Sequence, residues 1–156
     1  MDELRATTVD TPIGTLTLVA TDAGLREIRW PGSPPTVVPA RTAPVLDQAA
    51  EELTDYFGGR LRRFDVPLDL VGTPFQLRHW ASLAAIPYGT TTTYGDLAVR
   101  QGNVRRARAI GAANGANPVP IVLPCHRVVG TDGSLAGFGG GLEVKRLLLD
   151  HESRHR

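Results

Sequence analysis

One short segment of the chain places a nucleophile beside a titratable base. The only cysteine, Cys125, is followed directly by His126 and preceded by Pro124, inside the apolar run 122–130. We expect a strand in this run, with Pro124 at its end or edge, because proline has no amide to donate to a sheet. Neighbouring side chains of a strand point to opposite faces, so a contact between Cys125 and His126 requires local irregularity or a bridging water.

A carboxylate near the C-terminus offers the third member of a catalytic set. Glu152, on the predicted last helix, is placed to orient the imidazole of His126, and a thiolate, a base and an orienting group together serve nucleophilic catalysis. Such neighbours lower a thiol pKa from about 8.5 to about 3.5–7.5. The alternative, a lone cysteine that acts as a small buried hydrophobe, stays open on composition alone.

The segment before the cysteine predicts three helices that position it. The first begins with a capping box, in which Thr73 caps and Gln76 reaches back, with proline at the first helical position. Its expected buried stripe consists of Leu77, Trp80, Ala81 and Ala84. The second helix starts after Thr93 and ends before Gly102, and the third covers residues 104–116. Two short helices joined by a glycine-containing turn predict a helix-turn-helix.

The third helix combines arginines with very small residues. Its first turns hold Arg105, Arg106 and Arg108, and a run of Gly111, Ala112, Ala113, Gly115 and Ala116 follows. A glycine costs a helix about 1 kcal/mol relative to alanine, so something must favour it. Either a bulky partner such as a nucleic-acid groove approaches the backbone, or the helix packs tightly inside the core. The arginines alone also fit an ordinary solvated face.

The first 70 residues predict a small α+β module without evident chemistry. Alternating segments form β-hairpins that break at 12–14 and 22–24, a proline-rich stretch covers 31–44, and a short strand covers 64–72. Between them a helix ends at 58–59, with apolar residues at helical spacing: Leu46, Ala49, Ala50, Leu53 and Phe57. We expect Trp30, Phe75 and Trp80 to serve packing, and His79 and His155 to lie at the surface.

Charge is distributed unevenly over a chain of 156 residues with a net charge of +1. Residues 1–72 carry 7 Arg and 11 Asp or Glu, whereas residues 73–156 carry 10 Lys or Arg and 5 Asp or Glu. This asymmetry fits either a polyanionic partner of the second half or unevenly scattered surface charge. The acidic, polar start and the lack of a long apolar run predict neither a secretory signal nor a membrane helix, and the single cysteine fits a reducing cytoplasm.

Four strings of the second half resemble one known family. "NPVPIVLPCHRVVG" is similar to the active-site signature of the O6-alkylguanine-DNA alkyltransferases, and the likeness extends through "IPYGTTTTYGDLA", "RARAIGAANGANP" and "GFGGGLEVKRLLLDHE". The resemblance covers essentially residues 73–152. The resemblance implies an α+β fold with a small N-terminal ribonuclease-H-like α/β module over 1–70. A mostly helical C-terminal domain over 71–156 would carry the helix-turn-helix and an active-site loop.

The resemblance also implies a suicide DNA-repair reaction. Cys125 would accept a methyl or other alkyl group from O6-alkylguanine, with O4-alkylthymine as a second substrate class. His126 would act as base through water and Glu152 would hold it. Tyr94 would donate toward guanine N3, and Asn117 would tie the recognition helix to the active-site turn. The protein would use no cofactor and no metal, and would act as a monomer, with cooperative binding along DNA left open.

The resemblance further assigns a DNA interface and a base pocket. The third helix would enter the minor groove, and Arg108 would fill the duplex when the damaged nucleotide flips out. The surrounding contacts would come from Arg105, Arg106, Ala107, Gly111, Ala112 and Gly115. The pocket would comprise Tyr94, Val128, Phe138, Gly139 and Lys145. Phe138 stands where many relatives carry tyrosine and Gly139 where some carry serine, which puts tolerance for bulky alkyl groups in doubt.

Three rival functions remain at this point. A non-catalytic alkyltransferase-like protein would bind the lesion without repairing it, although such relatives replace the cysteine. A cysteine hydrolase with a Cys-His-Glu triad would turn over many times. A transcriptional regulator would use the same helix pair on undamaged DNA.

Overall fold

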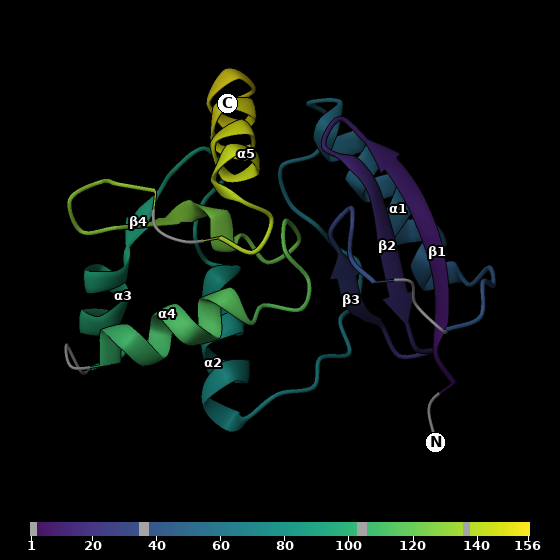
Figure 1. Ribbon diagram of the computed structural model, residues 1–156, viewed down its shortest axis with the longest axis horizontal. Helices are drawn as coiled ribbons and strands as arrows, with labels where there is room; N and C mark the ends of the chain where they lie inside the picture. The colour runs from purple at the N-terminus through teal and green to yellow at the C-terminus, as the bar shows by residue number, and fades with distance from the viewer. Residues whose placement is uncertain (1–2, 35–37, 103–105, 136–137) are drawn as a thin grey trace. The chain divides into compact units, whose positions relative to one another are not determined.

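The computed structural model describes residues 3–34, 38–102, 106–135 and 138–156. Contacts divide the chain into two compact units, Met1–Val71 and Gly72–Arg156, whose elements Figure 1 labels. Among the described residues, no helix is both long and apolar enough to cross a membrane.

The first unit is built on an antiparallel three-stranded sheet. Strands β1 (Arg5–Thr11), β2 (Gly14–Ala20) and β3 (Leu25–Arg29) pair in chain order. The turns fall at the two predicted breaks, and Gly14 adopts φ 109°, a conformation that favours glycine. The hairpin predictions are therefore confirmed. The predicted strand over 64–72 is wrong: only Leu68 bridges, in parallel, to Leu25.

Helix α1 (Pro44–Phe57) packs against this sheet and closes the core of the first unit. Its buried residues are Leu46, Ala49, Leu53 and Tyr56, which lie at the expected helical spacing. They meet fully buried side chains of β2 and β3, including Leu16, Leu18 and Leu25. Tyr56 rather than the predicted Phe57 is the buried aromatic residue at the end of the stripe.

The second unit is mostly helical, as predicted. It contains α2 (Pro74–Leu83), α3 (Tyr94–Arg100), α4 (Ala107–Gly115) and α5 (Leu142–Arg154). Thr93 caps α3 by accepting a hydrogen bond from the Asp96 amide at 3.0 Å. Gly102 adopts φ 82° just beyond this helix, and α3 and α4 pack together as a helix pair. The start predicted for the third helix, 104–105, lies outside the described residues.

The buried face of α2 differs from the prediction. Trp80 is buried, but its buried neighbours are His79 and Leu83, whereas Leu77, Ala81 and Ala84 are exposed. A stripe chosen by hydrophobicity is therefore rotated away from the true one. His79 was expected at the surface, yet it is buried because Asn114 of α4 provides a polar partner for its ring.

Two short strands connect the helix pair to the cysteine segment. Strand β4 (Thr92–Thr93) pairs in parallel with β5 (Val128–Val129), with Thr92 opposite Val128. Because Tyr94 follows β4 directly and Cys125 lies three residues before β5, this small ladder brings both segments to one place.

The capping box of α2 provides a direct test of this local analysis. Thr73 accepts from the Gln76 amide at 3.1 Å, and the Thr73 amide donates to Gln76 Oε1 at 2.9 Å. Thr73→Ala should lower the free energy of unfolding by about 1 kcal/mol, measured by urea denaturation. Thr91→Ala, at an exposed loop threonine, serves as the control and should change stability little. Equal effects of the two variants would contradict a stabilising cap.

Candidate active site and nucleic-acid interface

Cys125 lies in a tight turn rather than in the predicted strand. Residues Cys125–Arg127 form a 3₁₀ turn, labelled η2, and the strand β5 begins only at Val128. In a 3₁₀ turn, successive side chains project about a third of a revolution apart instead of to opposite faces. The local irregularity that a Cys125–His126 pair requires is therefore present.

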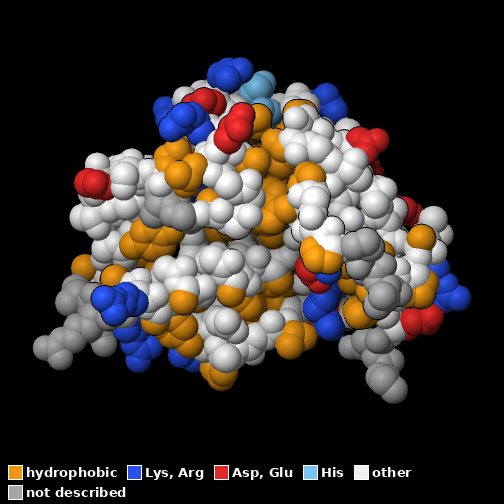
Figure 2. Space-filling model, in the orientation of Figure 1, with side chains coloured by type: hydrophobic (Ala, Val, Ile, Leu, Met, Phe, Trp, Pro, Cys, Tyr) orange, Lys and Arg blue, Asp and Glu red, His pale blue; other side chains and the backbone are white. Residues whose placement is uncertain are grey.

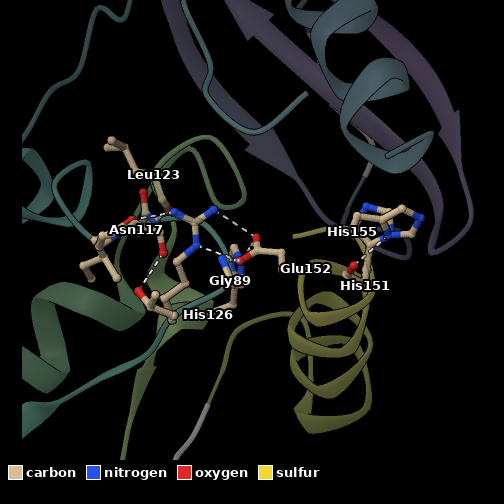
Figure 3. Close-up of polar contacts among 11 residues, drawn as sticks. Gly89, Asn117, Leu123, His126, His151, Glu152 and His155 are labelled. Atoms are coloured by element: carbon tan, nitrogen blue, oxygen red, sulfur yellow. Dashed lines mark hydrogen bonds and ion pairs between the residues drawn. The ribbon is translucent and has the colours of Figure 1, made fainter. Parts of the chain in front are cut away.

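Asn117 braces the loop that leads into this turn. Its Nδ2 donates to the Leu123 carbonyl at 2.8 Å, and its Oδ1 accepts from the Val119 amide at 3.1 Å (Figure 3). The buried Ile121 between them adopts φ 74°, a left-handed conformation that is strained for a β-branched residue. Asn117 follows α4 in the chain and bonds the backbone of the segment that leads to the cysteine turn.

A buried carboxylate joins two side chains of the η2 turn. Glu152, 1% exposed, reaches from α5 to accept from His126 Nε2 at 2.6 Å and from Arg127 Nε and Nη2 at 2.8 and 3.0 Å (Figure 3). The Gly89 amide also points to this carboxylate, at 3.3 Å. Arg127 additionally donates to the Ile86 carbonyl at 2.6 Å. His151 of α5 and His155, which follows that helix, lie away from this cluster (Figure 3).

The contacts of His126 define which ring nitrogen is free to act as a base. Burial lowers the pKa of His126 despite the neighbouring Glu152, because Arg127 already balances the carboxylate charge. The neutral ring therefore carries its proton on Nε2, facing Glu152. Nδ1 is buried and makes no hydrogen bond to any described residue, so its lone pair is available.

The thiol is protonated in this state of the protein. Burial raises the pKa of Cys125 to about 11, although Asn117, Lys145 and the turn amides favour the thiolate. The expectation of a lowered pKa is wrong, because it considered the charged neighbours and not the depth of the site. The thiol must therefore transfer its proton to an acceptor during the reaction.

Tyr94 and Lys145 supply further polar groups beside the turn. Burial raises the pKa of Tyr94, so the phenol keeps its proton, and its oxygen accepts from Asn114 Nδ2 at 3.3 Å. Lys145 of α5 is fully buried and donates to the Val128 carbonyl at 2.6 Å. Its ammonium lies 5.9 Å from the ring centroid of Phe138. Of the five predicted pocket residues, Val128 belongs to β5 and Lys145 bonds its carbonyl. Phe138 lies near Lys145, and Tyr94 contacts Asn114, which bonds the Cys125 carbonyl. Gly139 is exposed.

Helix α4 presents an exposed face of arginines and small residues. Its buried residues are Ile110, Ala113 and Asn114, and its exposed ones include Arg108, Ala107, Ala112 and Gly115. Arg106, which precedes the helix, is also exposed, and its guanidinium lies 5.4 Å from the Phe75 ring centroid. Figure 2 shows basic side chains gathered near the start of α4. Arg105 lies outside the described residues.

Internal packing does not explain the glycines of α4. A Cβ built on Gly111 or Gly115 would meet no neighbouring atom of the described chain within 4 Å. Tight packing inside the core, one of the two explanations for the small residues, is thereby removed for these two positions. The other explanation, that the small residues leave room for an external partner to approach the helix backbone, stays open.

Comparison with known proteins decides the family. Models described as the DNA binding domain and the ribonuclease-like domain of 6-O-methylguanine DNA methyltransferase match residues 74–154 and 4–70. The chain belongs to the 6-O-methylguanine DNA methyltransferase family. The family resemblance and the α+β fold class drawn from the sequence are confirmed. The hydrolase and transcriptional-regulator alternatives receive no support from these matches.

Individual members of the methyltransferase family cover nearly the whole chain. A methylated-DNA–protein-cysteine methyltransferase of Mycolicibacterium paratuberculosis is 48% identical over 153 residues, which are 95% of this chain and 92% of the relative. A crystal structure of Mycobacterium tuberculosis OGT in complex with DNA superposes with a TM-score of 0.88 at 43% identity, covering 97% of this chain and 93% of that one. An enzyme from Pyrococcus kodakaraensis, 23% identical with a TM-score of 0.57, shares the fold.

Sequence reasoning missed three residues of this methyltransferase site. No role was predicted for Arg127 of the active-site motif, although it donates two hydrogen bonds to Glu152. Asn114 was passed over inside a run of small residues, and His79 was assigned to the surface. Asn114 could have been found from the sequence, because it is a polar residue on a helix face made otherwise of apolar or small residues.

The reactivity of the thiol tests the electrostatic account. Because the pKa of Cys125 is raised to about 11, alkylation by iodoacetamide should be slow at neutral pH and should rise with pH without levelling off near the free-thiol pKa of about 8.5. The rate is followed by intact mass, with Cys125→Ser to establish specificity and urea-unfolded protein to supply the ordinary titration. A plateau at or below the free-thiol value in the folded protein would contradict the account.

Proposed function

We propose that this chain repairs DNA directly, by irreversible transfer of a methyl or other alkyl group from guanine O6 to its own Cys125. It is a methylated-DNA–protein-cysteine methyltransferase that acts once per molecule. The observation that carries the proposal is the buried Cys125–His126–Glu152 arrangement in a chain whose family and near relatives bear that name. O4-alkylthymine is a second, chemically similar substrate.

The transfer is an in-line displacement at the alkyl carbon. The bond from Cys125 Sγ to that carbon forms while the bond from the carbon to guanine O6 breaks, and the electron pair goes to the base. The thiol loses one proton and the released guanine gains one, so charge is conserved. The thioether product does not hydrolyse, and neither a cofactor nor a metal has a part in these steps.

His126 generates the thiolate in this mechanism. Its free Nδ1 accepts the thiol proton through a water molecule, while Glu152 stabilises the imidazolium that results. Arg127 fixes Glu152 in position through two hydrogen bonds. The thiol is neutral at rest and His126 is its proton acceptor. Cys125 therefore becomes reactive only when an alkylated guanine occupies the site.

Tyr94 and Lys145 assist the departure of the base. The Tyr94 hydroxyl donates to guanine N3 and so stabilises the negative charge that develops on the leaving group. Lys145 adds positive charge next to the thiol and holds the Val128 carbonyl. Val128, Phe138 and Gly139 line the base pocket.

The exposed face of α4 enters the minor groove of duplex DNA. Its small residues permit close approach of the helix backbone, and Arg108 replaces the flipped nucleotide in the base stack. Arg105 and Arg106 contribute phosphate contacts. Residues 71–156 thus carry DNA binding and transfer, and residues 1–70 form a structural domain. The protein works in the cytoplasm as a monomer.

Intact mass measurement tests the proposed reaction. The protein is incubated with a duplex oligonucleotide that carries O6-methylguanine, and the chain is weighed and digested. We expect a stoichiometric gain of one methylene unit on Cys125, and none in Cys125→Ser. Binding of the lesion without any mass gain would instead support the damage-binding alternative, and repeated turnover of an ester would support the hydrolase.

The role of Arg108 makes a separate prediction. Arg108→Ala should slow transfer from duplex DNA by about tenfold to a hundredfold, because a flipped base leaves an unstacking cost of a few kcal/mol uncompensated. Transfer from the free O6-methylguanine base should stay unchanged. Arg154→Ala, which removes the same charge from an exposed site on α5, is the matched control. Equal losses on duplex and free base would overturn the flipping role.

A further inference from the structure

A chain of polar side chains runs through the second unit next to the cysteine turn. Gln101, at the C-terminal end of α3, lies with Nε2 3.3 Å from His79 Nδ1, and His79 Nε2 lies 3.2 Å from Asn114 Oδ1. Asn114 Nδ2 in turn lies 3.3 Å from both Tyr94 Oη and the Cys125 carbonyl. His79 and Asn114 are 1% and 4% exposed, so these hydrogen bonds are made away from solvent.

The acceptor at the Cys125 end fixes the direction of every hydrogen bond in this chain. A carbonyl oxygen can only accept, so the Asn114 amide nitrogen must face it, and Oδ1 must face His79. His79 therefore donates from Nε2. Burial lowers the pKa of His79, so the ring is neutral and its Nδ1 accepts from the Gln101 amide.

This direction determines where the Tyr94 proton points. Asn114 has two amide protons, one for the Cys125 carbonyl and one for the Tyr94 oxygen. Because Tyr94 accepts from Asn114, its own single proton cannot point back along that contact. The hydroxyl proton is left to be donated to another group in the site.

We infer that Asn114 is a positioning residue for the alkyl transfer, held in one orientation by His79 and Gln101. By donating to the Tyr94 oxygen, Asn114 directs the Tyr94 O–H toward the acceptor nitrogen of the bound purine. By donating also to the Cys125 carbonyl, it fixes this orientation relative to the thiol. The inference rests on the proposed function, in which Tyr94 donates to guanine N3. Since Gln101 ends α3 and Asn114 belongs to α4, the helix pair that binds DNA also orients the donor for the leaving group.

Asn114→Asp reverses the hydrogen bond to Tyr94 with almost no change of shape. The carboxylate accepts from the Tyr94 hydroxyl, so the proton turns inward, away from the substrate. Single-turnover methyl transfer is measured on duplexes carrying O6-methylguanine or O6-methyl-3-deazaguanine, in which a C–H group replaces N3. We expect the variant to slow the first reaction by about tenfold or more beyond its effect on the second, because the added charge near Cys125 affects both reactions whereas a misdirected donor affects only the substrate that has N3.

Two comparisons separate positioning from general damage to the site. In a Tyr94→Phe background, Asn114→Asp should slow both substrates equally, because the donor that it orients is already gone and only its contact with the Cys125 carbonyl is left to lose. Thr91→Asp adds the same charge at an exposed loop position and should leave both substrates unaffected. Equal slowing of both substrates by Asn114→Asp in the wild-type background, or an undiminished difference between the substrates in the Tyr94→Phe background, would overturn the inference.

A second variant keeps the test valid if the buried carboxylate prevents folding. The double substitution His79→Leu/Asn114→Leu replaces both partners by apolar groups of similar size, which buried sites tolerate better than a single unpaired polar group. It should show the same selective loss on O6-methylguanine. If the wild-type protein transfers no methyl group at all, the proposed function fails instead; if it does transfer but neither variant discriminates the substrates, only the role of Asn114 fails.

Discussion

The buried carboxylate of Glu152 is the constraint on which the active site depends. It comes from the last helix and binds two adjacent side chains of the cysteine turn, His126 and Arg127. A buried ion pair of this kind contributes little net stability, but loss of one partner leaves an unpaired buried charge that costs about 3–5 kcal/mol. The carboxylate therefore also secures the geometry: α5 must lie against the η2 turn for Arg127 to be neutralised, and that placement leaves His126 Nδ1 as the only free base of the turn.

Burial serves two purposes in this site. It holds the Cys125 thiol neutral, which protects a residue that can react only once from adventitious electrophiles. It also keeps His126 and His79 neutral and Tyr94 protonated, so each group has a defined donor or acceptor role. Two acceptors, the Cys125 carbonyl of the turn and the Glu152 carboxylate of α5, then set the direction of the hydrogen bonds on either side of the thiol.

Local sequence signals predicted much of this fold, and tertiary contacts account for the errors. The Thr73 cap, the hairpin turns and the α3–α4 pair depend on residues close together in the chain, so they could be predicted. The apolar run around Cys125 has no period that separates strand from turn, and its 3₁₀ conformation is set by Asn117 and Glu152 from elsewhere. His79 was misplaced because only its pairing with Asn114 makes burial of a histidine favourable. The raised pKa of Cys125 likewise depends on depth, which no spacing reveals.

The protonation of His126 tests the central claim most directly. The ring nitrogens can be observed by ¹⁵N nuclear magnetic resonance in protein labelled at histidine, assigned with a His126→Gln variant. The account predicts a neutral ring that is protonated at Nε2 and unprotonated at Nδ1 wherever the protein is folded and unreacted. A proton on Nδ1, or a ring already cationic beside the neutral thiol, would contradict the account, because His126 would then have no lone pair with which to activate Cys125.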